Sequence, residues 1–153
     1  PCYGEWFYGV VKPRIIIEKF LKDAENNVPV DYKVFCFGGE PKYIVVDTDR
    51  FTDHRKNVYD LNWKLMKGYR LGFSNGKAIK RPEQLNKILK EAQKLSREFP
   101  HTRVDFYINN QKVYFGEITF TNGAGFDKIS PRYFDEELGS YIKLPIKQVY
   151  NIE

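Results

Sequence analysis

Two adjacent strand-like segments, each with one carboxylate in its interior, constrain the fold of this chain more than any other feature. The stretch from Arg103 to Gly125 reads RVDFYINNQKVYFGEITFTNGAG and places Asp105 and Glu117 among Val, Phe, Tyr and Ile. Strand interiors disfavour Asp, and a lone buried charge is costly. Two acids in facing strands are tolerated if a divalent cation neutralises them. The segment therefore predicts a hairpin that carries a metal-phosphate site.

The two carboxylates share one face of this hairpin only if the connection has the right parity. Side chains alternate between the faces of a strand, so a three-residue loop at 110–112 sets Asp105 opposite Glu117, with β-carbons about 5 Å apart. A two-residue loop puts them on opposite faces. The functional interpretation therefore requires an odd loop or a bulge. Arg103 and Thr119 are expected on the same face as the two acids.

One cation, two carboxylates and one hydroxyl on a single surface suit magnesium, which keeps water ligands and bridges to substrate phosphates. Arg103 would supply positive charge to a transferring phosphoryl group. The alternative is an exposed face on which Arg103, Asp105 and Glu117 form ion pairs that contribute little. The glycine-rich loop at 122–125 favours the metal-phosphate site, because glycine lets the backbone approach a ligand closely.

The remaining sequence predicts one α+β unit with a mainly antiparallel sheet and one long helix. The helix runs from Pro82 to Phe99, where apolar residues recur at spacings of three and four. Segments 31–37 and 42–47 predict a hairpin around a glycine turn. The remaining predictions are a buried strand at 15–21, a solvated charged loop at 47–60, a packed loop at 61–76 and a short helix at 135–140.

Composition bounds the compartment and the partners. The chain has 153 residues, a hydrophobic fraction of 42% and a formal charge of +5, with basic residues interleaved with acids. No run of five or six basic residues forms, so nucleic acid is not an expected partner. Cys2 and Cys36 lack metal-ligand spacing and indicate a reducing, cytoplasmic compartment. No apolar run approaches the roughly 20 residues that a transmembrane segment needs.

The hairpin resembles the C-terminal core of ATP-grasp enzymes, which show Arg-x-Asp on one strand, Glu-x-Asn on the next and a glycine a few residues on. The phrases KPRIIIEKFL, DYKVFCFGGEPKYIVVD, DRFTDHRKNVYD and RVDFYINNQKVYFGEITF are similar to the TupA-like ATP-grasp family. That family is associated with teichuronopeptide and other cell-surface polysaccharide synthesis. The resemblance covers almost the whole chain.

The resemblance implies a carboxylate–amine ligase with ATP and Mg²⁺ as cofactors. Asp105 and Glu117 match its magnesium ligands, and Thr119 stands where many members have Asn. Arg103 matches the arginine that contacts the transferring phosphate, and Gly123 matches the glycine whose backbone approaches the reacting carbonyl. A threonine offers one neutral oxygen, so the motif leaves open whether one or two metal ions bind.

The resemblance also implies a nucleotide site and a second substrate. Four of the implied nucleotide contacts would lie in the segment against the adenine: Glu18, Lys19, Phe20 and Leu21. Two more, Asp31 and Lys33, match the family's nucleotide contacts more loosely. The implied partners are a nucleotide and a glycan-precursor or amino-acid substrate, with the acceptor and the amine donor left open.

ATP-grasp folds clamp the nucleotide between two subdomains. The glycine-rich phosphate loop and upstream lysine of the first subdomain are not visible, and the chain begins at Pro1. We therefore expect residues 1–153 to be a single C-terminal ATP-grasp domain, a fragment without the N-terminal subdomain that is inactive by itself. Two other functions stay open. Asp47-Thr48-Asp49 is similar to the Asp-x-Asp motif of glycosyltransferases, and the chain could be a non-catalytic binding module.

Overall fold

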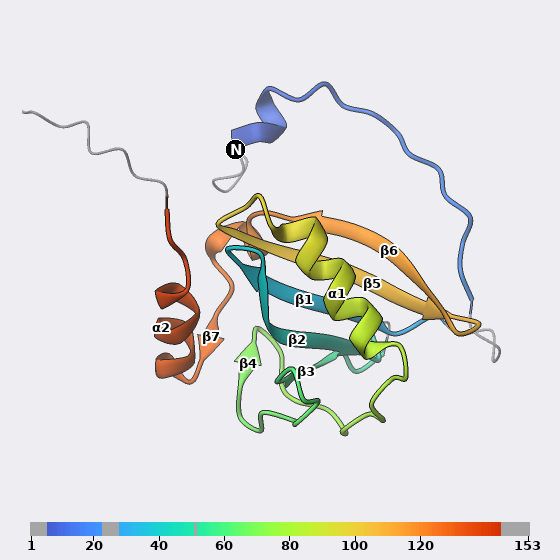
Figure 1. Cartoon of the computed structure of the whole chain (residues 1–153), viewed down its shortest axis with the longest axis vertical. Helices are drawn as coiled ribbons and strands as arrows, with labels where there is room; N and C mark the ends of the chain where they lie inside the picture. The colour runs from blue at the N-terminus through green and yellow to red at the C-terminus, as the bar shows by residue number, and fades with distance from the viewer. Residues whose placement is uncertain (1–5, 23–27, 51, 145–153) are drawn as a thin grey trace, which may run out of the picture.

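The structure is a computed structural model that describes residues 6–22, 28–50 and 52–144. Its centre is a five-stranded antiparallel sheet in the order β3-β2-β1-β5-β6 (Figure 1). The five strands, in chain order, are β1 (Asp31–Phe37), β2 (Glu40–Thr48), β3 (Arg55–Tyr59), β5 (His101–Asn109) and β6 (Lys112–Thr119).

A second, two-stranded sheet and four helical segments complete the described fold. The small sheet pairs β4 (Arg70–Leu71) with β7 (Ile129–Ser130). The helical segments are η1 (Trp6–Gly9), α1 (Leu85–Ser96), η2 (Asn122–Gly125) and α2 (Arg132–Ser140). The predicted α+β class with a mainly antiparallel sheet is confirmed. No helix among the described residues is long and apolar enough to cross a membrane.

Helix α1 covers one face of the large sheet and closes a first core (Figure 1). The buried side chains of this core alternate along β1 and recur every three or four residues along α1: Tyr32, Val34, Cys36, Leu85, Ile88 and Ala92. The two periodicities predicted for these segments are thus both used to bury apolar surface. Burial raises the pKa of the Cys36 thiol to about 11, which agrees with a buried, unreactive cysteine.

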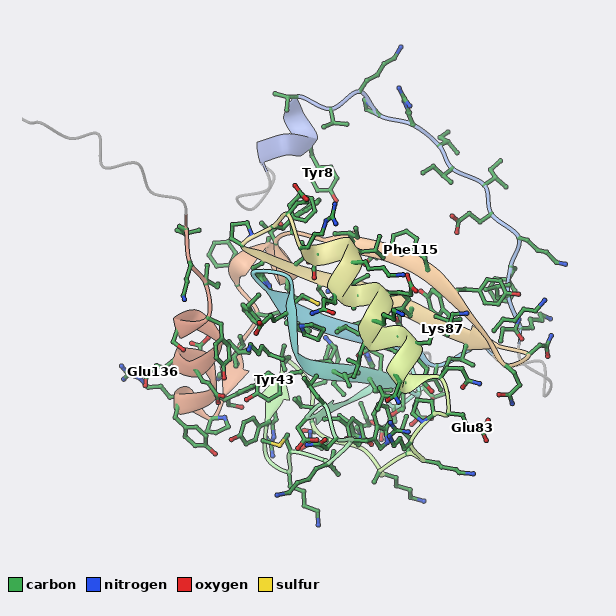
Figure 2. The ribbon with its side chains drawn as sticks, in the orientation of Figure 1. Tyr8, Tyr43, Glu83, Lys87, Phe115 and Glu136 are labelled. Carbon is green, nitrogen blue, oxygen red and sulfur yellow. The ribbon has the colours of Figure 1, made fainter. Side chains whose placement is uncertain are left out.

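The opposite face of the sheet has an apolar half and a charged half. In the apolar half, Phe35, Tyr43 and Val45 pack with Phe134 and Leu138 of α2. Figure 2 shows Tyr43 on the side of the sheet that faces α2, and its hydroxyl donates a hydrogen bond to Glu137 at 2.7 Å. Farther along the same strands, charged side chains replace the apolar ones on this face.

The predicted buried strand at 15–21 is wrong. This segment is extended and exposed, with Ile15 and Ile17 each 92% accessible to solvent. It lies away from the sheet in Figure 1, so no neighbouring strand covers its apolar side chains. An apolar run becomes a buried strand only where a partner strand and a packing layer are present.

The predicted solvated loop at 47–60 is also wrong in part, because it contains β3. This strand pairs with β2 through contacts such as Val45 with Val58 and Asp47 with Lys56. Val58 and Tyr59 are buried, while Arg55 and Lys56 are half-buried. The charges concealed the strand, because an edge strand needs only part of its length in the core.

Helix α1 provides a test of the first core. Ile88→Ala is expected to lower the free energy of unfolding by about 2–5 kcal/mol, because it leaves a cavity where a fully buried side chain stood. Urea unfolding at neutral pH measures this loss. The matched control Lys90→Ala, on the exposed side of the same helix, should change stability by no more than about 0.5 kcal/mol. Equal effects of the two variants would contradict the packing of α1.

Candidate functional site

The turn between β5 and β6 has two residues. Asn109 pairs with Lys112, so only Asn110 and Gln111 form the turn. Both have positive φ angles, 49° and 63°, which is the geometry of a type I′ hairpin that matches the twist of the strands. Of the two arrangements that put Asp105 and Glu117 on one face, an odd loop or a bulge, the odd loop is therefore not the one used. A two-residue turn alone would put the two acids on opposite faces.

A bulge in β6 restores the common face. On the turn side Phe106 pairs with Phe115, and beyond the bulge the register is shifted by one residue. Two residues of β6, Gly116 and Glu117, therefore oppose the single Asp105. A Cβ at position 116 would lie 3.1 Å from the Asp105 carbonyl oxygen, so glycine permits the close approach. The bulge that the sequence required as the alternative to an odd loop is confirmed.

Arg103 is the centre of the contacts between the two acids. Its Nε donates to Asp105 Oδ1 at 2.7 Å, and its Nη2 donates to Asp105 Oδ2 at 2.8 Å and to Glu117 Oε1 at 2.7 Å. Its Nη1 donates to Asn122 Oδ1, and Thr119 Oγ1 donates to Glu117 Oε1 at 3.2 Å. The structure thus brings Arg103, Asp105, Glu117 and Thr119 together, as the sequence predicted.

Lys33 joins this hairpin to the middle of the sheet. Its Nζ lies 2.6 Å from Asp105 Oδ2, 2.5 Å from Asp31 Oδ2 and 3.8 Å from Asp47 Oδ2. Lys33 and Asp105 are register partners on β1 and β5, and Asp31 and Asp47 are partners on β1 and β2. Asp31 and Lys33, predicted as nucleotide contacts, therefore lie at the same centre as Arg103.

Two further cationic or titratable groups extend the centre toward β3. Arg50 Nη1 lies 3.1 Å from Asp31 Oδ2, and His54 Nε2 lies 3.4 Å from Asp47 Oδ1. We call the following set the charged cluster: Asp31, Lys33, Asp47, Arg50, Arg103, Asp105 and Glu117. Sequence analysis did not assign Asp47 or Arg50 to this site, because their contact with β1 depends on strand pairing.

Burial removes water from several charged side chains of the cluster, so these charges depend on one another for stabilisation. The side chains of Asp31 and Asp105 are 1% exposed, whereas that of Glu117 is 61% exposed. Desolvation raises the pKa of Asp31, and the charge of Lys33 opposes that rise. For Lys33, desolvation lowers the pKa, but the attraction of Asp105 and Asp31 outweighs it and the pKa is raised overall. The lysine is therefore charged at neutral pH.

The loop after β6 holds Arg103 from another direction. Asn122, whose Oδ1 accepts a bond from Arg103, donates through Nδ2 to Asp127 Oδ2. Gly123 has a φ of 53°, and a Cβ there would collide with the Asp127 carboxylate. Glycine is therefore needed for the loop's own packing, whatever else it approaches. The sequence pattern drew attention to the glycines of this loop but not to Asn122 or Asp127.

The predicted adenine contacts lie outside the charged cluster. Glu18, Lys19, Phe20 and Leu21 belong to the extended segment before the sheet, and Phe20 is 66% exposed. Within the described residues, no hydrogen bond or ion pair links Glu18 or Lys19 to the charged cluster.

The two acids of the Asp-x-Asp sequence lie in different environments. Asp47 is buried against Lys33, while Asp49 is exposed on the loop that follows β2. The structure therefore does not present the two carboxylates as one metal-binding pair.

Asp105, Glu117 and Thr119 are the residues that would hold a magnesium ion shared with a phosphate ligand. Among the described residues, no group of three or more His, Cys, Asp or Glu side chains is placed to hold a metal ion. Asp105 and Glu117 nevertheless converge on one atom, Arg103 Nη2, and Thr119 adds a neutral oxygen beside them. Two carboxylates and a hydroxyl match the way Mg²⁺ is usually bound, with waters and substrate phosphates completing its octahedron.

Lys33→Met tests the buried charges. The variant should lose about 3–5 kcal/mol of folding free energy at neutral pH, because several buried carboxylates lose their shared cation. Without Lys33, the pKa of Asp31 rises further above its unfolded value. The folded state then binds more protons than the unfolded chain, so the variant becomes less stable as pH rises.

Chemical unfolding at about pH 7 and about pH 4.5 should therefore show a larger deficit at the higher pH. The exposed control Lys87→Met should differ from the parent by no more than about 0.5 kcal/mol at either pH (Figure 2). A deficit that grows toward acid pH would contradict the contacts described for Lys33.

Gly123→Ala tests the loop that holds Arg103. The left-handed conformation costs an alanine about 1 kcal/mol or more, and the contact with Asp127 adds to that loss. The matched control is Gly139→Ala in α2, where nothing lies near the new methyl group, and it should stabilise by up to about 1 kcal/mol. Thermal unfolding that ranks the two variants in the opposite order would show that the loop packs differently.

A family model identifies the lineage of this arrangement. The model described as TupA-like ATPgrasp matches residues 4–143, a range that includes the whole charged cluster. No curated protein and no solved structure matches the chain. With the family match over most of its length and an antiparallel sheet that carries Arg-x-Asp beside Glu-x-Thr, the chain belongs to the TupA-like ATP-grasp family.

Proposed function

We propose that this chain serves an ATP- and magnesium-dependent carboxylate–amine ligase in cell-surface polysaccharide biosynthesis, located in the cytoplasm. The observation that supports this most is the convergence of Asp105 and Glu117 on Arg103 at the β6 bulge. ATP would activate a substrate carboxylate as an acyl phosphate, from which an amine displaces phosphate and loses a proton to give the amide. The large sheet would form the C-terminal side of the nucleotide clamp.

In this proposal the exposed Glu117 of β6 and the buried Asp105 of β5 hold magnesium from the two strands of the hairpin, with Thr119 as a neutral ligand. Asp105 is fixed in orientation because cations from two strands hold both of its oxygens. Glu117 is exposed and can turn its Oε2 toward solvent. One rigid and one adjustable carboxylate would let the site accept a metal ion that arrives with a nucleotide.

Arg103 would stabilise the negative charge on the transferring phosphoryl group. Three of its side-chain contacts reach carboxylates, whereas Nη1 contacts the neutral amide of Asn122. Hydrogen bonds between two charged groups are stronger than those to a neutral amide. An entering phosphate oxygen would therefore displace Asn122 from Nη1, because that hydrogen bond is the weakest of the four to break. Asp105 would continue to hold the guanidinium in place.

Lys33 and Asp31 would act beside the nucleotide chiefly by positioning Asp105. The proposed roles of Gly123 at the reacting carbonyl and of residues 18–21 at the adenine come from the family resemblance alone.

Calorimetric titration of the chain with ATP, with and without Mg²⁺, tests the proposal. Glu117→Gln should weaken the magnesium-dependent binding about tenfold or more, since it removes a charged ligand from an exposed position that folding does not need. Asp105→Asn should do the same. The control Glu136→Gln, on the outer side of α2, should bind like the parent (Figure 2). Unchanged magnesium-dependent affinity in both site variants would refute the metal assignment.

A further inference from the structure

A small pocket lies at the N-terminal end of α1, on the face of the sheet opposite to the charged cluster. Its volume is about 300 Å³, and its walls come from the chain around the start of β1, from residues 80–84 and from the turn end of the β5–β6 hairpin. Tyr32 and Ile108 in these walls both pack with the first core under α1. Asp31 and Lys33, the neighbours of Tyr32 on β1, therefore point to the other face. This α1 pocket is thus separate from the charged cluster.

Part of the α1 pocket is apolar and incompletely covered. Val30 and Ile108 are half-buried and pack against the first core, and Pro29 and Pro82 add further apolar surface. Removing such surface from water is favourable, so a ligand with an apolar body gains affinity here. The volume of the pocket lies at the lower limit of ligand sites in proteins, which restricts the ligand to a small molecule.

The rim of the α1 pocket carries more positive than negative charge. Its charged residues are all exposed: Lys80, Arg81 and Glu83, the last of which Figure 2 shows beside the start of α1. Arg81 Nη2 donates to the neutral Asn86 Oδ1 at 2.9 Å. Within the described residues, neither Lys80 nor Glu83 has an ion-pair partner. Two cations against one acid favour a ligand with a negative group.

Helix α1 begins at this pocket without the groups that usually neutralise a helix start. Gln84 at the N-cap makes no side-chain capping hydrogen bond, and the first turn contains no acidic residue. The side chain of Gln84 instead donates to Gln111 Oε1 at 2.5 Å and joins α1 to the β5–β6 turn. The first N–H groups of a helix lack intrahelical partners and attract an oxyanion. The helix start therefore adds to the attraction of the rim for a negative group.

Tyr32 provides an unused hydrogen-bond donor at the same place. The residue is 7% exposed and lines the α1 pocket, and its hydroxyl has no hydrogen-bond partner within the described residues. Burial raises the pKa of Tyr32, so the phenol keeps its proton at neutral pH and can donate a hydrogen bond to a ligand oxygen. A largely buried hydroxyl without a partner is unfavourable. A ligand that accepts a hydrogen bond from it therefore gains affinity.

We propose that the α1 pocket binds a small organic oxyanion with an apolar body: a phosphate ester or a carboxylate of an aromatic or branched group. The body covers Val30 and Ile108. The oxyanion accepts a hydrogen bond from the Tyr32 hydroxyl and lies near the start of α1 and the two cations of the rim. This site goes beyond the proposed ligase function, because it lies on the opposite face of the sheet from the charged cluster.

Amide NMR spectra of the isotopically labelled chain test the proposal with four probes. Phenyl phosphate and benzoate carry both features, inorganic phosphate has only the negative group, and benzyl alcohol has only the apolar body. At millimolar concentrations phenyl phosphate or benzoate should shift the amides of Val30, Gln84 and Gln111. Inorganic phosphate and benzyl alcohol should each bind about tenfold more weakly. The tighter of the two organic anions identifies the head group.

Two substitutions test the residues of the site. Tyr32→Phe keeps the ring in the first core and removes only the hydroxyl, so it should fold as the parent does. It should weaken the organic anion about fivefold, because a hydrogen bond to an oxyanion is lost. Lys80→Met, at an exposed position, should weaken it about threefold. The matched controls Tyr114→Phe and Lys128→Met remove the same groups elsewhere on the surface and should leave binding unchanged.

Three results would overturn the proposal: no shift of these amides with either organic anion, equal binding of inorganic phosphate or benzyl alcohol, or unchanged affinity in Tyr32→Phe. Shifts of the same amides with magnesium and ATP would assign the pocket to the nucleotide and refute a separate site. The organic anions need no nucleotide, so their binding and the magnesium-dependent binding of ATP can each fail without the other.

Discussion

The buried carboxylate of Asp105 is the group on which the rest of the site depends. Arg103 of the same strand holds both of its oxygens, and Lys33 of β1 holds one of them again. These contacts replace the water that a carboxylate loses at 1% exposure, and losing either cation would leave a buried charge that costs several kcal/mol. The pairing of β1 with β5 and the bulge of β6 must both be correct for the charges to balance.

One face of the sheet serves two purposes because its strands change character along their length. Phe35 and Val45 face α2 in one half, and Lys33 and Asp47, two residues away on the same strands, face the charged cluster. Side chains of alternate residues share a face, and the change to charged residues comes at Lys33 on β1 but one pair later on β2, where Asp47 pairs with Asp31. Apolar packing under α2 thereby anchors the strands that position the charges.

The hairpin shows how far sequence reasoning reaches. The alternation of side chains along the strands predicted that Asp105 and Glu117 share a face only with an odd loop or a bulge. The structure has a bulge at Gly116. A glycine within a strand pattern is a recognised sign of a bulge, so the signal was present in the sequence. The long helix, the hairpin at 31–47 and the grouping of Arg103 with Asp105 were also predictable, because local periodicity or spacing determines them.

Other parts of the site could not be predicted from local patterns. Asp47 reaches Lys33 because β1 pairs with strands on both sides, and Asn122 reaches Arg103 across 19 residues of chain. The apolar run at 15–21 has the composition of a strand but no partner in the described fold. Composition reports what a segment is able to bury, while only the tertiary arrangement decides whether anything covers it.

The charged cluster also spans the sheet from β2 to the edge strand β6. Charges alternate from Asp47 through Lys33, Asp105 and Arg103 to Glu117, so each interior group divides its attraction between two neighbours. A cation that bound Glu117 would compete with Arg103 for this carboxylate, and the guanidinium would keep its contacts with Asp105 and Asn122. A charge bound at the β6 end of this row would alter the electrostatic field at Asp47, and thermodynamic reciprocity would make the reverse effect equally large. The strength of each ion pair in such a row depends on its neighbours, so the pairs are coupled and a change in any one of them is expected to alter the others.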